Sequence, residues 1–98
     1  MDYRFKSKKL EALFTSKKGA KRYPEGVVSS FFRVMTIIAS ATDVQDFIAL
    51  KSRRFEKLCG DREGQYSMRL NDQYRLILEI REEAQRKYLL IVEIVDYH

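Results

Sequence analysis

Residues 66–95 read YSMRLNDQYRLILEIREEAQRKYLLIVEIV, and this stretch decides the fold. At its start Tyr66, Met68 and Leu70 alternate with polar residues, and a second alternating run covers residues 74–81. A period of two is typical of strands with one buried face. Asn71 and Asp72 separate the two runs and predict the turn of a hairpin.

The same stretch continues into a third strand. Residues 82–87 are polar and predict a second turn, and residues 88–95 are apolar on both faces, as in a central strand. The sequence therefore predicts an antiparallel meander in the second half of the chain.

The first half shows helical spacing. Residues 3–6 predict a short strand, and Ser7 is a plausible N-cap for a helix that contains Leu10 and Leu13. Residues 25–41 carry apolar side chains three and four apart, which predicts an amphipathic helix. Residues 42–45, TDVQ, fit a capping box and predict a further short turn of helix. Helices followed by a meander predict an α+β fold, in a single domain over residues 1–98.

Composition narrows the class of protein. The 98 residues are 45% hydrophobic, and apolar runs such as residues 89–92 are too short to cross a membrane. The N-terminus lacks the apolar segment of a secretory signal. Cys59 is the only cysteine, so no internal disulfide can form. We therefore expect a cytoplasmic protein without a membrane partner.

The charge balance favours acidic partners. Nineteen basic residues against 14 acidic ones give a net charge of +5, which suits nucleic acid or an acidic protein. Many of the basic residues crowd the first quarter of the chain, where a solvated helix face would look the same.

Most enzyme signatures are absent. Residues 60–64 do not form a phosphate-binding loop, and one His with one Cys cannot make an ordinary zinc site. We therefore expect no cofactor and no metal. Metal-free RNA cleavage needs a base, a cation on the phosphate and an acid, and Arg, Glu, Asp, Tyr and His all occur after Arg53. Arg69, Arg75 and Arg81 are expected on one sheet face, either as phosphate contacts or as a solvated face with ion pairs.

Three segments resemble the HigB branch of the RelE-like toxins. Residues 58–67, LCGDREGQYS, are similar to the family segment L-x-G-D-R-x-G-x-[WY]-S. Residues 71–76, NDQYRL, resemble the strand N-x-x-[WY]-R-[IL], and residues 92–98, VEIVDYH, match the ending V-x-x-x-D-Y-H. The three occur in the family's order and spacing.

The resemblance implies a fold and an activity. The fold is two N-terminal helices packed on a twisted antiparallel β-sheet. The activity is a metal-independent endoribonuclease that cleaves mRNA in the ribosomal A site and so inhibits translation. The implied partner is a cognate antitoxin, usually a HigA-like helix-turn-helix protein, so that contact with DNA is only indirect.

The resemblance also implies site residues. Arg75 corresponds to the phosphate-contacting arginine, and Asp96, Tyr97 and His98 to the C-terminal functional residues. Glu56 stands where some members carry the catalytic His, and Cys59 stands where they carry Lys.

These positions give a hypothesis for the mechanism. Glu56 is the base, as a glutamate is thought to be in the related YoeB toxins. Arg75 contacts the phosphate, and His98 is the acid. Tyr97 stacks on a base and Asp96 orients its neighbours.

Further arginines and a lysine are candidates for RNA or phosphate binding, in part to compensate for the missing Lys: Arg54, Lys57, Arg62 and Arg69. Two other interpretations stay open. One is a binding module that keeps the toxin fold but has little nuclease activity, which the replaced His and Lys favour. The other is a DNA-binding regulator, which the lack of a helix-turn-helix pattern disfavours.

Overall fold

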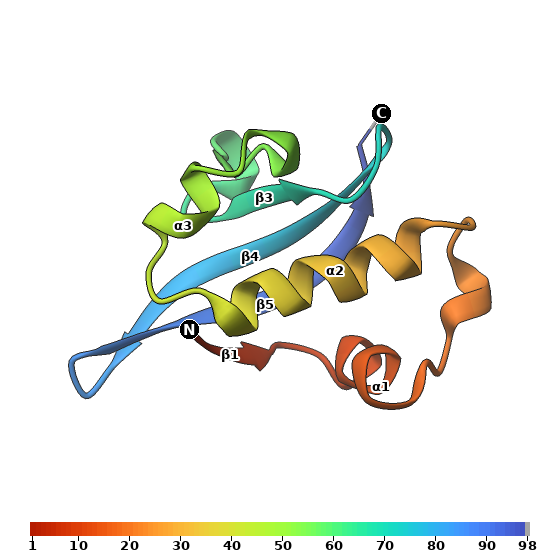
Figure 1. Cartoon of the computed structure of the whole chain (residues 1–98), viewed down its shortest axis with the longest axis horizontal. Coiled ribbons are helices and arrows are strands. Elements are labelled where there is room, and N and C mark those ends of the chain that lie inside the picture. The colour runs from red at the N-terminus through yellow and green to blue at the C-terminus, as the bar shows by residue number, and fades with distance from the viewer. Residues whose placement is uncertain (98) are drawn as a thin grey trace.

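A computed structural model describes residues 1–97 and arranges the strands in one sheet, in the order β1-β5-β4-β3-β2 (Figure 1). The strands are β1 (Asp2–Phe5), β2 (Glu56–Lys57), β3 (Tyr66–Arg69), β4 (Tyr74–Glu83) and β5 (Arg86–Asp96). The α-helices are α1 (Lys8–Ser16), α2 (Val27–Ser40) and α3 (Gln45–Ile48). Short 3-10 turns occur at Ala20–Arg22, Lys51–Arg53 and Gly60–Arg62.

The predicted hairpin is confirmed as β3 and β4. Arg69 pairs with Arg75 and Met68 with Leu76 in antiparallel register. The Asn71 side-chain oxygen accepts hydrogen bonds from the backbone N–H groups of Gln73 (2.8 Å) and Tyr74 (2.7 Å). This side-chain-to-backbone bonding is the reason that the chain turns here.

The second turn is shorter than residues 82–87, and that prediction is wrong in length. Strand β4 continues to Glu83 and β5 begins at Arg86, so only Ala84 and Gln85 form the turn. Both take positive φ, 52° and 66°, as a two-residue hairpin turn requires. Neither residue is a Gly or Asn, so the sequence lacked the usual signal for this turn.

A β-bulge shifts the alternation of strand β5. Ile77 of β4 pairs with Glu93, whereas Leu78 pairs with Ile91, so Val92 is an extra residue. Strict alternation would place Glu93 on the same face as Ile91, under the helices. The bulge instead turns Glu93 to the opposite face, which we call the outer face, and Val92 packs there against Ile77.

The helices cover the other face of the sheet (Figure 1). The Ser7 side chain accepts a hydrogen bond from the N–H of Leu10 (3.3 Å), which confirms the predicted N-cap of α1. Helix α2 begins at Val27, two residues later than predicted, after Gly26 in a left-handed conformation (φ 90°). Its buried side chains join α1 and the sheet in one core that includes Phe31 and Ile38.

Strand β1 makes the sheet mixed. The predicted antiparallel pairing holds from β2 to β5, but β1 pairs in parallel with β5, Tyr3 opposite Leu89. Alternation within a four-residue strand does not encode the direction of its partner.

The capping prediction for residues 42–45 is right about the helix and wrong about the capping side chain. Helix α3 forms, but the side chain that accepts from the Thr42 N–H (2.9 Å) is the carboxylate of Asp46 and not the amide of Gln45. This backbone hydrogen bond holds the pKa of Asp46 below its usual value.

No helix in the described part of the chain is both long and apolar enough to span a membrane.

Candidate active site

The register of the sheet brings Glu56 and Arg75 to the outer face. Glu56 pairs with Ser67, which pairs with Ile77, and in the adjacent row Arg69 pairs with Arg75. Residues that pair across strands point to the same face. Two strand spacings and one two-residue step separate the Cα atoms of Glu56 and Arg75 by roughly 12 Å. Between them on this face lie Ser67 and Ile77, which are both buried.

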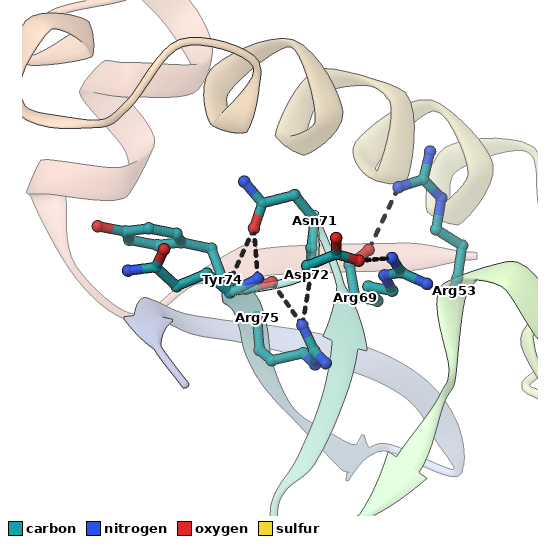
Figure 2. A network of polar contacts seen from close by, with 7 residues as sticks. Arg53, Arg69, Asn71, Asp72, Tyr74 and Arg75 are labelled. Carbon is teal, nitrogen blue, oxygen red and sulfur yellow. Dashed lines mark hydrogen bonds and ion pairs between the residues drawn. The ribbon is translucent and has the colours of Figure 1, made fainter. Parts of the chain in front are cut away.

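The Arg75 guanidinium is held by the hairpin turn that precedes it (Figure 2). Its Nη1 donates to the backbone oxygens of Asn71 (2.7 Å) and Tyr74 (3.1 Å), and the side chain is half-buried. Within residues 1–97 its Nε and Nη2 bond to no acceptor. Because one nitrogen is tied to the backbone, the remaining edge of the planar group has a fixed direction, as bidentate binding of a phosphate needs.

Tyr97 lies against the same guanidinium. The Arg75 Cζ is 5.4 Å from the centre of the Tyr97 ring, within the range of a cation–π contact. Tyr97 is 47% exposed, so part of the residue is open to solvent. An exposed aromatic ring beside a fixed arginine combines a stacking surface with a phosphate contact.

The end of β5 is fastened by Gln73, a residue that the sequence analysis did not single out. The backbone oxygen of Gln73 accepts a hydrogen bond from the Tyr97 N–H (2.6 Å), and its Nε2 donates to the Asp96 carboxylate (3.0 Å). Asp96 pairs with Tyr74, so alternation places it on the helix side of the strand and not beside Arg75. The sequence offered one indication of this role, since Gln73 belongs to the same turn as Asn71. Only the register of β4 with β5, however, brings Gln73 to residues 96 and 97. His98 lies outside the described residues.

Arg69 is engaged in an ion pair beside this turn. Its guanidinium contacts the exposed carboxylate of Asp72, and its backbone oxygen accepts from Arg53 (3.2 Å), as Figure 2 shows. Arg81, predicted on the same face, lies six residues beyond Arg75 along β4 and pairs with Glu79 (Nε to Oε1, 2.7 Å). Arg69 is thus next to Arg75, whereas Arg81 is about 20 Å away along the strand.

The other predicted cations have different surroundings. Lys57 follows Glu56 and pairs with Tyr66, so it points to the opposite face. Arg54 precedes β2 on an exposed turn with left-handed backbone (φ 44°). Arg62 donates to Glu93 (3.2 Å) and to the Gln65 side chain (3.0 Å) on the outer face. The structure therefore groups Glu56, Arg69, Arg75 and Tyr97 on one face, while Arg62 ties its loop to the sheet.

The loop of residues 60–65 is anchored on a nearly buried carboxylate. Gln65, which accepts a hydrogen bond from Arg62, itself donates one to Glu79 (2.9 Å). The Glu79 side chain is only 14% exposed. The hydrogen bond from Gln65, and then the contact with Arg81, hold the pKa of Glu79 below its usual value. The free thiol of Cys59 is exposed at the start of this loop.

We expect Glu79→Gln to lower the free energy of unfolding at pH 7 by about 1 kcal/mol, because a charge-assisted hydrogen bond and an ion pair are lost. Because the pKa of Glu79 is lower in the folded protein than in the unfolded chain, the carboxylate stabilises the fold at pH values above its unfolded-state pKa. That stabilisation is lost as the pH falls through the folded-state pKa. The difference in free energy of unfolding between wild type and Glu79→Gln should therefore become smaller as the pH is lowered. Urea denaturation from pH 7 to pH 3.5 measures it, with Glu82→Gln at the exposed end of β4 as control. An unchanged difference at all pH values would contradict this role for Glu79.

No group of three or more His, Cys, Asp or Glu within residues 1–97 is arranged to hold a metal ion.

Comparison with known proteins agrees with this architecture. Residues 3–98 match the family model described as the RelE-like toxin of type II toxin–antitoxin system HigB. Toxin HigB-1 of Vibrio cholerae serotype O1 is 34% identical over 79 residues, which are 81% of this chain and 83% of that protein.

Solved structures share the fold at low sequence identity. YafQ from E. coli strain BL21(DE3) superposes with a TM-score of 0.65 at 12% identity, over 97% of this chain and 91% of its own. A YoeB/ParE toxin from Agrobacterium tumefaciens gives a TM-score of 0.58 at 14% identity, with all of both chains covered. These likenesses confirm N-terminal helices on a five-strand sheet. With the family match over nearly the whole length, they show that the chain belongs to the HigB family of RelE-like toxins of type II toxin–antitoxin systems.

Proposed function

We propose that this toxin is an endoribonuclease that cleaves mRNA on the ribosome without a metal ion and thereby inhibits translation. One observation carries most weight: the guanidinium of Arg75 is fixed by two backbone oxygens beside the exposed Tyr97 ring, on the same face as Glu56. Electrostatic stabilisation of the charge that develops in the transition state, as by a fixed cation, is usually the largest single contribution to an enzyme's rate enhancement.

In the proposed reaction Glu56 accepts the proton of a ribose 2′-OH, and the 2′-oxygen attacks the adjacent phosphorus. The bond from phosphorus to the 5′-oxygen breaks, leaving a 2′,3′-cyclic phosphate, and His98 donates a proton to the 5′-oxygen. Arg75 stabilises the charge on the phosphoryl oxygens. The Cα atoms of Glu56 and Arg75 are roughly 12 Å apart, so their side chains reach the reacting linkage from two sides.

The remaining residues position the substrate. Tyr97 stacks on a base that is turned out of the RNA strand, and Arg69 contacts a neighbouring phosphate in exchange for Asp72. Asp96, held by Gln73, orients the end of β5. Arg54, Lys57 and Arg62 contribute to RNA binding outside the reacting linkage.

The toxin acts in the cytoplasm and is neutralised by a HigA-like helix-turn-helix antitoxin, through which alone it contacts DNA. A second candidate is a binding module with little nuclease activity. The observation that favours it is that Glu56 and Cys59 stand where some members carry His and Lys.

Expression of the chain without its antitoxin tests the proposal. We expect growth arrest and new mRNA 5′ ends spaced by codons, mapped by sequencing of transcript ends. The same experiment with the antitoxin co-expressed should show neither effect. Intact transcripts and normal growth at confirmed soluble expression would reject the nuclease and leave the binding module.

A further inference from the structure

A second basic feature lies on the helix side of the molecule, away from the outer face. A cavity of about 280 Å³ opens between α1 and the 3-10 turn at Ala20–Arg22. Four of the eight residues that line it are cations; the eight are Lys8, Lys9, Ala12, Leu13, Lys18, Gly19, Arg22 and Tyr23. These residues come from two segments, so the cluster exists only in the folded chain.

Within the described residues, no ion pair neutralises the cations of this cavity. Residues 6–22 contain seven Lys or Arg and one acidic residue, Glu11. The ion pairs found within residues 1–97 all involve arginines outside this segment, such as Arg62 and Arg69. Like charges therefore face one another across the cavity, which an anion in it would relieve.

Two of these lysines also oppose the dipole of their own helix. Lys8 and Lys9 are the first two residues of α1, where the helix carries partial positive charge. Cations at this end destabilise a helix, so neither lysine is explained by the stability of the fold.

We infer that this cavity binds backbone phosphates of folded RNA, and that it docks the toxin while the outer face engages the cleaved strand. The inference rests on the proposed function, which brings the chain to the ribosome. Separate cations around one opening, with a tyrosine at its wall, suit a phosphate backbone that carries one charge per nucleotide. Since α1 packs on the face of the sheet opposite Arg75, the two RNA contacts do not compete.

Ribosome binding by a non-cleaving toxin tests this site. In an Arg75→Ala background we would compare Lys8→Gln/Lys9→Gln with Lys51→Gln/Lys87→Gln, a control that removes the same charge from exposed positions elsewhere. The probe is the 70S ribosome programmed with mRNA, titrated at 50 to 250 mM salt. We expect the cavity variant to bind about tenfold more weakly, with a slope of log K against log salt reduced by about 2. Its melting temperature should equal or exceed that of the parent.

Other results would overturn the inference. Equal affinity and slope in the cavity and control variants would show that the cavity is not an RNA site. Intact ribosome binding with loss of antitoxin binding would assign the cavity to an acidic protein. A second variant from the other wall, Lys18→Gln/Arg22→Gln, must behave as the first does. If the Arg75→Ala parent itself fails to bind ribosomes, the result contradicts the proposed function. If the parent binds and the cavity variants bind equally well, only the cavity site is contradicted.

Discussion

Arg75→Ala should reduce the rate of mRNA cleavage by about 30- to 1000-fold, which corresponds to a loss of roughly 2–4 kcal/mol of transition-state stabilisation. The physical reason is the fixed guanidinium, which needs no reorganisation as charge develops on the phosphate. Single-turnover cleavage on programmed ribosomes measures the effect, since it separates the chemical step from product release.

Two further variants separate catalysis from folding. Arg75→Lys keeps the charge but loses the planar fork, and it should recover only a small part of the rate. Arg81→Ala removes an arginine from the same strand and face, about 20 Å away, and should cleave normally. Normal cleavage by Arg75→Ala would remove this residue from the site. If the variant unfolds, as loss of the bonds to Asn71 and Tyr74 would allow, Arg75→Lys decides the question.

Deleting residues 97 and 98 should abolish toxicity and lower cleavage by a factor of about 100 or more, since a positioned acid commonly contributes at least that much. Antitoxin binding and melting temperature should change little. Tyr97 is half exposed and adds one backbone hydrogen bond to Gln73, while the buried part of β5 ends earlier, at Val92.

Point variants assign the two residues separately. If His98 is the acid, cleavage should fall as the pH rises through the range where an imidazolium loses its proton, and His98→Gln should remove that limb of the profile. Tyr97→Phe retains the ring beside Arg75 and should retain most activity, whereas Tyr97→Ala should not. Full activity of the truncated chain would contradict the C-terminal mechanism and require a different acid for Glu56.

The elements that were predicted correctly are those set by local chemistry. Alternation over residues 66–81 is enough to place β3 and β4, because a half-buried strand requires it. The Asn71 side chain specifies its turn through its own bonds to the backbone, and Ser7 specifies the start of α1 in the same way. The parallel direction of β1 was missed because it depends on a partner that is distant in the chain. The length of the turn at Ala84 and Gln85 was wrong because neither residue is a usual residue for positive φ.

By itself, the sequence determined the α+β class, the toxin family, and the residue types available for RNA cleavage. Tertiary structure alone decided which of them meet. Sheet register sets Glu56 and Arg75 on one face, the bulge at Val92 turns Glu93 outward to receive Arg62, and the pairing of β4 with β5 brings Gln73 to Asp96 and Tyr97. The reason is that strand periodicity repeats every two residues and encodes neither partner nor register, so one added residue exchanges the two faces. The register of the strands is set by the packing of the sheet against the helices, which involves residues from the whole chain.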